Sequence, residues 1–187
     1  MHIAAIVEGY GDVKSVPSLV AKTGSHLEIA AYAPNPIRAG EWNLLKRPGQ
    51  LERFLELAAT RGADKILVII DLDDGCVAEE YAHFVERSQT WRNGRHIDVD
   101  CCFLNREYET LFLHDPQSMG HFDPEKIPEN PESIRGAKEA VSRAAGKRYK
   151  ETQDQLIYTN SLSVETCLQN SRALRKLAKC IFGSYDF

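Results

Sequence analysis

Short apolar segments alternate with amphipathic stretches over the first 114 residues. Four of these segments are too short for helices and rich in apolar residues, which predicts strands at residues 2–7, 28–33, 65–70 and 96–104. Helical spacing of apolar positions predicts helices at residues 13–21, 51–62 and 77–91. The unbroken run KILVII at 65–70 is typical of a parallel strand that is buried on both faces. The alternation predicts an α/β fold, with a mostly parallel sheet of about four strands flanked by helices.

The pattern changes after residue 114. Residues 34–48 and 115–131 are predicted as loops, and residues 106–114 as a short helix or a turn into one. From Ile134 onward the chain looks helical, with breaks near Gly146 and at residues 159–163. We therefore expect an α/β core over residues 1–114. Residues 115–187 are expected to form a loop and a helical C-terminal extension that packs on this core.

The composition is that of a globular protein. The 187 residues are 43% hydrophobic and 27% charged, which excludes a disordered chain and fits one domain with at most a small appendage. Apolar runs are too short for a membrane span, and the N-terminal run does not resemble a signal peptide. The five cysteines lack metal-type spacing, so we expect free thiols. A cytoplasmic protein with no membrane contact is predicted.

The charges are unevenly distributed. Residues 1–134 contain 13 Lys/Arg and 22 Asp/Glu, whereas residues 135–180 contain 10 Lys/Arg and 4 Asp/Glu. An acidic body with a basic C-terminal segment suits a cation site beside a surface that attracts polyanions. A basic helical face that is merely solvated is the alternative.

Acidic residues follow the predicted strands at the end where parallel sheets bind ligands. Glu8 follows the first strand, Asp71 and Asp73 the third, and Glu107 and Glu109 the fourth. Asp71 and Asp73 point the same way if the chain is extended, so both can reach one ion. Mg²⁺ is usually held by one or two carboxylates and substrate phosphates. Clustered carboxylates repel one another without a cation, which predicts a bound metal.

Other interpretations of these acids were considered. An EF-hand is excluded because Gly75 and Ala82 stand where calcium ligands are required. A solvated acidic turn remains open for Asp71 and Asp73. Glu107 and Glu109 would diverge on a helix and would face one ion only if the segment is extended. Asp12 is predicted as a helix N-cap rather than a ligand.

The segments Glu8-Gly9-Tyr10-Gly11-Asp12 and Asp71-Leu72-Asp73, each after an apolar strand, resemble the TOPRIM domain of topoisomerases, primases and OLD-family nucleases. Residues 105–113 and 148–152 extend the resemblance over most of the chain, to a bacterial branch of small TOPRIM-like proteins. The resemblance implies a Rossmann-like TOPRIM fold. It also implies that Asp71 and Asp73 bind Mg²⁺, for which Mn²⁺ is expected to substitute, and that Glu8 is a general acid/base or a ligand.

In OLD-type nucleases later acids help to hold a second metal, and Glu107 and Glu109 are the candidates here. No later lysine matches the nuclease pattern closely. Lys150 is the predicted catalytic cation, with Arg148 and Arg106 as alternatives. Further basic residues are expected to bind nucleic acid. This set comprises Arg38, Lys46, Arg47, Arg106, Lys147 and Arg148.

The function expected from the resemblance is Mg²⁺-dependent cleavage of phosphodiester bonds in DNA or RNA. OLD-type nucleases are coupled to ABC-type ATPases in antiphage defence or DNA repair. This chain lacks a Walker A sequence, so such an ATPase would be a separate protein. A homodimer is also considered. The main alternative is a non-catalytic TOPRIM-like module that binds nucleic acid or regulates an ATPase; a phosphotransfer receiver-like domain fits less well.

Overall fold

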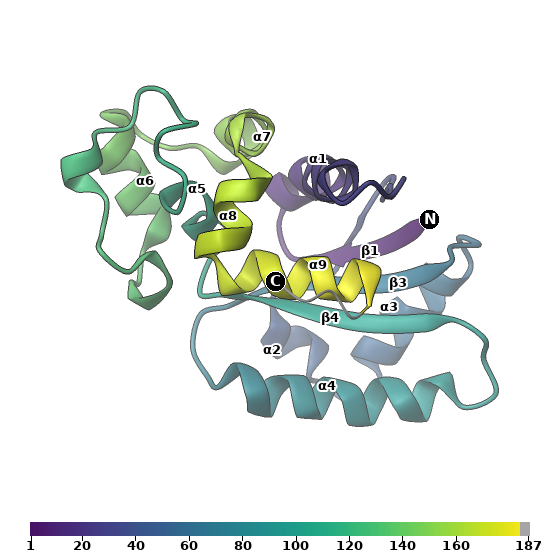
Figure 1. The fold of residues 1–187 in the computed structure, drawn as a ribbon. Coiled ribbons are helices and arrows are strands. Elements are labelled where there is room, and N and C mark those ends of the chain that lie inside the picture. Colours follow the sequence, from purple (N-terminus) through teal and green to yellow (C-terminus); the bar gives the residue numbers. More distant parts are fainter. Residues whose placement is uncertain (184–187) are drawn as a thin grey trace.

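Four parallel strands form one sheet in the order β2-β1-β3-β4 in the computed structural model, which describes residues 1–183 (Figure 1). The strands are β1 (Ile3–Val7), β2 (Ile37–Arg38), β3 (Lys65–Leu72) and β4 (Asp98–Asn105). β1 pairs with β3 over five residues and with β2 over two, while β3 pairs with β4 over eight. The predicted α/β fold with a parallel sheet of about four strands is confirmed.

Helices cover both faces of this sheet. The helices before residue 114 are α1 (Tyr10–His26), α2 (Trp42–Leu45), α3 (Gln50–Ala59), α4 (Val77–Arg92) and α5 (Thr110–Leu113). Those after it are the short 3₁₀ turns η1 (Pro124–Lys126) and η2 (Pro131–Ser133), and α6 (Ala137–Ala145), α7 (Glu151–Ser161), α8 (Val164–Asn170) and α9 (Arg172–Phe182). The predicted helical C-terminal part is confirmed. No helix within residues 1–183 has both the length and the apolar character needed to cross a bilayer.

Alternate side chains of the central strands enter two separate hydrophobic cores. Ile3, Ala5 and Val7 of β1 belong to the core under α1 and α9, whereas Ala4 and Ile6 belong to the core under α3 and α4. Both cores consist mainly of buried residues. Burial on both faces explains why the strand sequences are apolar without alternation. The C-terminal helices share the first of these cores, and α9 lies along β4 (Figure 1).

The second strand was predicted in the wrong place. Residues 28–33 contribute only an isolated bridge, between Tyr32 and His2, and Ile29 and Tyr32 are exposed. The strand that pairs with β1 is Ile37–Arg38, inside the predicted long loop, which also contains α2. β2 is an edge strand of two residues, so its sequence is too short to show a periodicity.

Helix α1 begins earlier than predicted. Its N-cap is Gly9, and Asp12 is the third residue of the helix rather than its N-cap. The Asp12 carboxylate accepts a hydrogen bond from Gly9 N over 2.8 Å, as the third helical residue does in a capping box. The expected N-cap role is therefore corrected, although Asp12 still stabilises the start of this helix.

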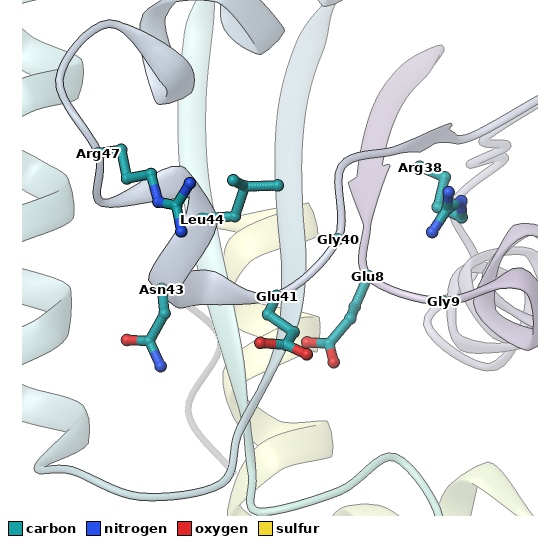
Figure 2. A pocket seen from close by; sticks show the side chains of 8 residues that line it. All are labelled: Glu8, Gly9, Arg38, Gly40, Glu41, Asn43, Leu44 and Arg47. Carbon is teal, nitrogen blue, oxygen red and sulfur yellow. The ribbon is translucent and has the colours of Figure 1, made fainter.

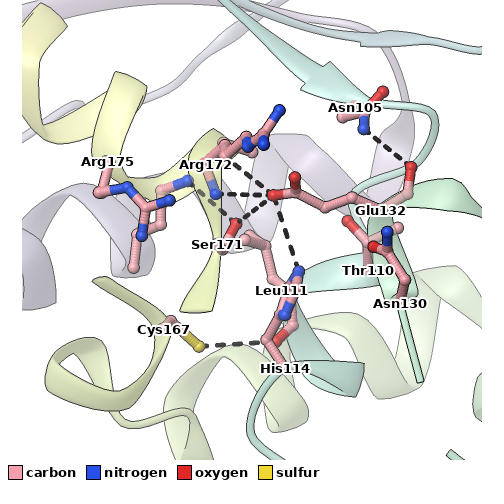
Figure 3. A network of polar contacts seen from close by, with 12 residues as sticks. Asn105, Thr110, Leu111, His114, Asn130, Glu132, Cys167, Ser171, Arg172 and Arg175 are labelled. Atoms are coloured by element: carbon pink, nitrogen blue, oxygen red, sulfur yellow. Dashed lines mark hydrogen bonds and ion pairs between the residues drawn. The ribbon is translucent and has the colours of Figure 1, made fainter. Parts of the chain in front are cut away.

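Glu132 ties the loop after the sheet to the start of α9 (Figure 3). Its Oε1 atom accepts hydrogen bonds from Arg172 N over 2.7 Å and from Ser171 Oγ over 3.2 Å, and lies 3.7 Å from His114 Nε2. The carboxylate thus satisfies a free N–H group at the helix start and complements the helix dipole. Its hydrogen bonds and His114 explain why the pKa of Glu132 is lowered despite burial.

Glu132→Ala is expected to lower the free energy of unfolding by about 2–3 kcal/mol, because a charged cap is lost and buried polar partners are left unpaired. Urea unfolding followed by circular dichroism measures this loss. Glu129→Ala removes an exposed acid from the same loop and should change stability by less than about 0.5 kcal/mol. Equal unfolding midpoints for the two variants would contradict the role of Glu132.

Candidate active site

The chain leaves the two central strands toward opposite faces of the sheet. β1 continues into α1 on one face, and β3 continues toward α4 on the other. Such a switch point opens a crevice at the carboxyl ends of two neighbouring parallel strands, where α/β proteins bind ligands. Glu8 directly follows β1 and Asp71 is the next-to-last residue of β3. The topology therefore brings the two predicted carboxylates into one crevice.

The crevice contains a cavity of about 40 Å³, which we call the acid cavity. Its lining consists of Glu8, Gly9, Asp12, Asp71, Tyr108, Glu109, Lys138, Glu151 and Gln155. Five of these residues are acids and one is a lysine. The acids come from segments that are far apart in sequence, so only the tertiary fold assembles them.

Two acids of this cavity have buried carboxylate oxygens that lack a hydrogen bond within residues 1–183. Among the described residues, neither oxygen of Glu109 nor Oδ1 of Asp71 has a hydrogen-bond partner, and Glu109 is only 1% exposed. Glu109 interacts with the nearby Tyr149 hydroxyl, which also lacks a hydrogen bond of normal geometry in this part of the chain. A buried carboxylate is costly unless it is paired, so this cavity favours a cation or protons.

Burial and mutual repulsion raise the pKa values of the acids. Burial, followed by the charges of Asp12, Asp73 and Glu41, raises the pKa of Glu8 to about 7. Burial raises the pKa of Glu109 to about 7 as well. The pKa of Asp71 is raised well above its ordinary value by burial and then by the neighbouring acids. A cluster that takes up protons so readily is one that a metal ion would neutralise.

Lys138 is the cation that sequence reasoning missed. It is the second residue of α6, and of residues 1–183 it is the only Lys or Arg that lines the acid cavity. Burial lowers the pKa of Lys138, but the charges of Glu109, Glu151 and Asp71 outweigh this effect and raise it. Its Nζ lies 3.3 Å from Glu151 Oε2.

The predicted catalytic Lys150 lies elsewhere. It is exposed, does not line the acid cavity, and occupies the N-cap position of α7, where its backbone N–H donates to Asp154. The lysine that lines the cavity is Lys138, 12 residues earlier in the chain. Nothing in the local sequence distinguishes the two lysines, because α6 is brought to the cavity by packing.

Glu107 and Glu109 have separate roles. Glu109 faces the acid cavity, as predicted for a ligand. Glu107 does not line it: its two carboxylate oxygens accept hydrogen bonds from Ala137 N over 2.9 Å and Lys138 N over 3.2 Å. It therefore holds the N-terminus of α6 and places Lys138. The side chains of Glu107 and Glu109 therefore diverge, and only Glu109 faces the cavity.

Asp73 borders a second cavity of about 160 Å³ that it shares with Glu8, Asp71 and Glu41. Burial and then the Glu107 charge raise the pKa of Asp73. Its neighbour Asp74 is ion-paired with Arg135 and Arg106. Arg106 also donates to the Asp73 carbonyl oxygen over 3.1 Å. Arg106, which was predicted to bind nucleic acid, therefore stabilises the acidic loop at residues 73–74.

A third cavity of about 480 Å³ also borders Glu8 and is called the arginine groove (Figure 2). It is lined by Glu8, Gly9, Arg38, Gly40, Glu41, Asn43, Leu44 and Arg47. Figure 2 shows Arg38 and Arg47 on opposite sides of the Glu8 and Glu41 side chains. These two arginines were predicted to bind nucleic acid, and they border the site.

The other predicted basic residues are not in these cavities. Lys46 forms an ion pair with Glu80 over 2.8 Å, and Lys147 one with Asp154 over 2.8 Å. Arg148 is exposed and does not line any of the three cavities. The basic residues at 147–150 therefore do not line these cavities, whereas Arg38 and Arg47 border the groove next to Glu8.

A family model described as a domain of unknown function, DUF4276, matches residues 7–180, and this span includes every residue of the acid cavity. The chain belongs to this family. Searches of curated proteins and of solved structures found no match. The family description assigns no chemistry, so the DUF4276 chain must be interpreted from its own residues.

The donor chemistry of the DUF4276 site fits a hard divalent cation. Within residues 1–183 no three His, Cys, Asp or Glu side chains are already gathered as a metal centre. The partnerless oxygens of Asp71 and Glu109 are nevertheless the type of donor that Mg²⁺ prefers. The acid cavity, at about 40 Å³, is also larger than the roughly 10–15 Å³ that a cavity needs to hold one water molecule. The residues that could hold such an ion are Glu8, Asp71, Asp73 and Glu109.

The raised pKa values predict a pH-dependent response to Mg²⁺. Glu8 and Glu109 titrate near 7 in the folded protein against an ordinary 4.5, so the folded state binds more protons between these values. Stability without metal should therefore fall as pH rises through this window. Mg²⁺ competes with those protons, so saturating Mg²⁺ should raise Tm by about 5 °C near pH 8 and by roughly zero near pH 5.5.

Differential scanning fluorimetry with and without EDTA measures these shifts. NaCl at matched ionic strength is the control, since it screens the acids without ligation. A Tm increase that is the same at both pH values would show that Mg²⁺ does not bind at these carboxylates.

Proposed function

We propose that this DUF4276 protein is a Mg²⁺-dependent enzyme that cleaves phosphodiester bonds of DNA or RNA. One observation supports the proposal above all others: Glu8 lines all three cavities. The acid cavity, the cavity around Asp73 and the arginine groove therefore meet at one carboxylate. A phosphate bound by Arg38 and Arg47 would lie beside the acids that could hold the metal.

Each residue has a role suited to its surroundings. Asp71, Asp73 and Glu109 would hold the cation, which when bound would polarise a phosphoryl oxygen and promote ionisation of water. Arg38 and Arg47 would bind the substrate backbone through charged hydrogen bonds.

Two further groups can serve the reaction directly. Glu8, with its pKa near 7, can take a proton from the attacking water at neutral pH. Lys138 stays protonated and can stabilise negative charge that develops on the phosphoryl group. Lys138 thus replaces Lys150 as the proposed cation. The separate ABC-type ATPase and the role in antiphage defence or DNA repair remain predictions from the TOPRIM resemblance, and the homodimer also remains a prediction.

A nicking assay tests the proposal. Supercoiled plasmid and labelled RNA are incubated with the full chain in Mg²⁺, Mn²⁺ or EDTA. Cleavage of either substrate is expected with both metals and should cease in EDTA. Binding of nucleic acid without cleavage under every metal condition would contradict the enzyme and support the non-catalytic module instead.

A further inference from the structure

Tyr10 is an aromatic residue at the entrance of the site. It is the first residue of α1, two positions after Glu8, and 64% of its surface is exposed. Most aromatic side chains of the described chain lie in the two cores. An exposed ring at the carboxyl edge of the sheet contributes little to folding and is available to a ligand.

Arg38 lies against this ring. Its guanidinium carbon is 4.2 Å from the ring centroid of Tyr10, which is the arrangement of a cation–π pair. Within residues 1–183, its guanidinium has neither a hydrogen bond nor an ion pair. Because one face of the guanidinium packs on the ring, the N–H groups in its plane remain free for a phosphate. Tyr10 and Arg38 together therefore offer a flat surface and phosphate donors beside the arginine groove.

We propose that an unpaired base stacks on the Tyr10–Arg38 pair, so that the site takes single-stranded nucleic acid. The inference rests on the proposed function, whose substrate class it specifies. Bases within a duplex are stacked on both faces and cannot offer a free face to a protein ring. Unpaired bases can, and stacking on aromatic side chains tolerates any sequence. The neighbouring groove holds the adjoining phosphates through Arg38 and Arg47.

Binding in EDTA tests the proposal independently of the metal. Fluorescence anisotropy is measured with labelled oligothymidylate, with its RNA counterpart and with a duplex of the same length. The full chain should bind the single strands about 10-fold more tightly than the duplex, and Tyr10→Ala should weaken single-strand binding about 10-fold. Tyr10→Phe keeps the ring and should bind like the wild type.

Tyr32→Ala is the matched control. Tyr32 is also exposed, at 53%, but it stacks on His2 next to the first residues of β1, away from the carboxyl edge. Its loss should leave affinity unchanged. Equal affinity for single strands and duplex, or equal losses in Tyr10→Ala and Tyr10→Phe, would overturn the stacking proposal. The DNA and RNA arms show which strand is preferred.

The outcomes separate this proposal from the proposed function. Single-strand binding that depends on the Tyr10 ring, without any cleavage, would support the stacking proposal and contradict the proposed enzyme function. Metal-dependent cleavage, together with a wild-type affinity of Tyr10→Ala for single strands, would support the proposed enzyme function and contradict the stacking proposal.

Discussion

Asp71→Asn is expected to lower Mg²⁺-dependent cleavage by a factor on the order of 10³. The variant loses a negatively charged ligand of the proposed metal ion, which would stabilise the transition state. The same variant should be more stable than the wild type in EDTA. Asp71 is a half-buried acid whose Oδ1 atom is buried and has no hydrogen-bond partner among residues 1–183, and its pKa is raised by burial and by its acidic neighbours. A neutral amide of the same shape removes that repulsion, which is the stability–activity trade-off expected of an active site.

Plasmid nicking measures the first effect and thermal unfolding in EDTA the second. Glu79→Gln is the matched control, since it neutralises an exposed acid at the start of α4 without contact to the cavities. It should change neither cleavage nor stability. Asp71→Asn with wild-type cleavage would contradict the metal role of Asp71. A lower Tm in EDTA would show that its carboxylate is stabilising instead.

The central part of the site could be predicted from the sequence because it depends on local pattern. An apolar run predicts a buried strand, and parallel strands present their following residues at one edge. Glu8 and Asp71 could therefore be placed together from strand ends alone. Arg38 and Arg47 were predicted as loop residues beside the cleft; both line the arginine groove, although Arg38 lies in β2 rather than in a loop.

The rest of the acid cavity could not be predicted in this way. Lys138, Glu151 and Gln155 come from α6 and α7, and no periodicity shows which of their polar residues face the sheet. The hydrogen bond from Gly11 N to Glu151 Oε1 joins residues 140 apart in sequence. Asp12 was predicted as the N-cap of α1; it is instead the third residue of this helix, bound by Gly9 N, and it also accepts a hydrogen bond from Gln155 Nε2 over 2.7 Å. The contacts between α1 and α7 arise from tertiary packing, so local sequence patterns do not predict them.

Gly11→Ala tests this packing. Gly11 lies on α1 against α7: an added Cβ would lie 2.5 Å from Glu151 Cγ and would also overlap Gln155 Oε1. Gln155 cannot simply turn away, because its amide is hydrogen-bonded to Asp12. The two helices would have to separate, at an expected loss of about 3 kcal/mol in the free energy of unfolding, from overpacking and weakened hydrogen bonds.

The sign of this change is diagnostic. Replacing glycine by alanine inside a helix normally stabilises it by up to about 1 kcal/mol, so a loss must come from the contact with α7. Urea unfolding measures it, with Ser25→Ala as a control at an exposed position near the end of α1 that should stay within about 0.5 kcal/mol of the wild type. A stabilised Gly11→Ala would show that α7 does not approach this closely. Because Glu151 and Gln155 line the acid cavity, a separation of the helices should also weaken the Mg²⁺-dependent rise in Tm.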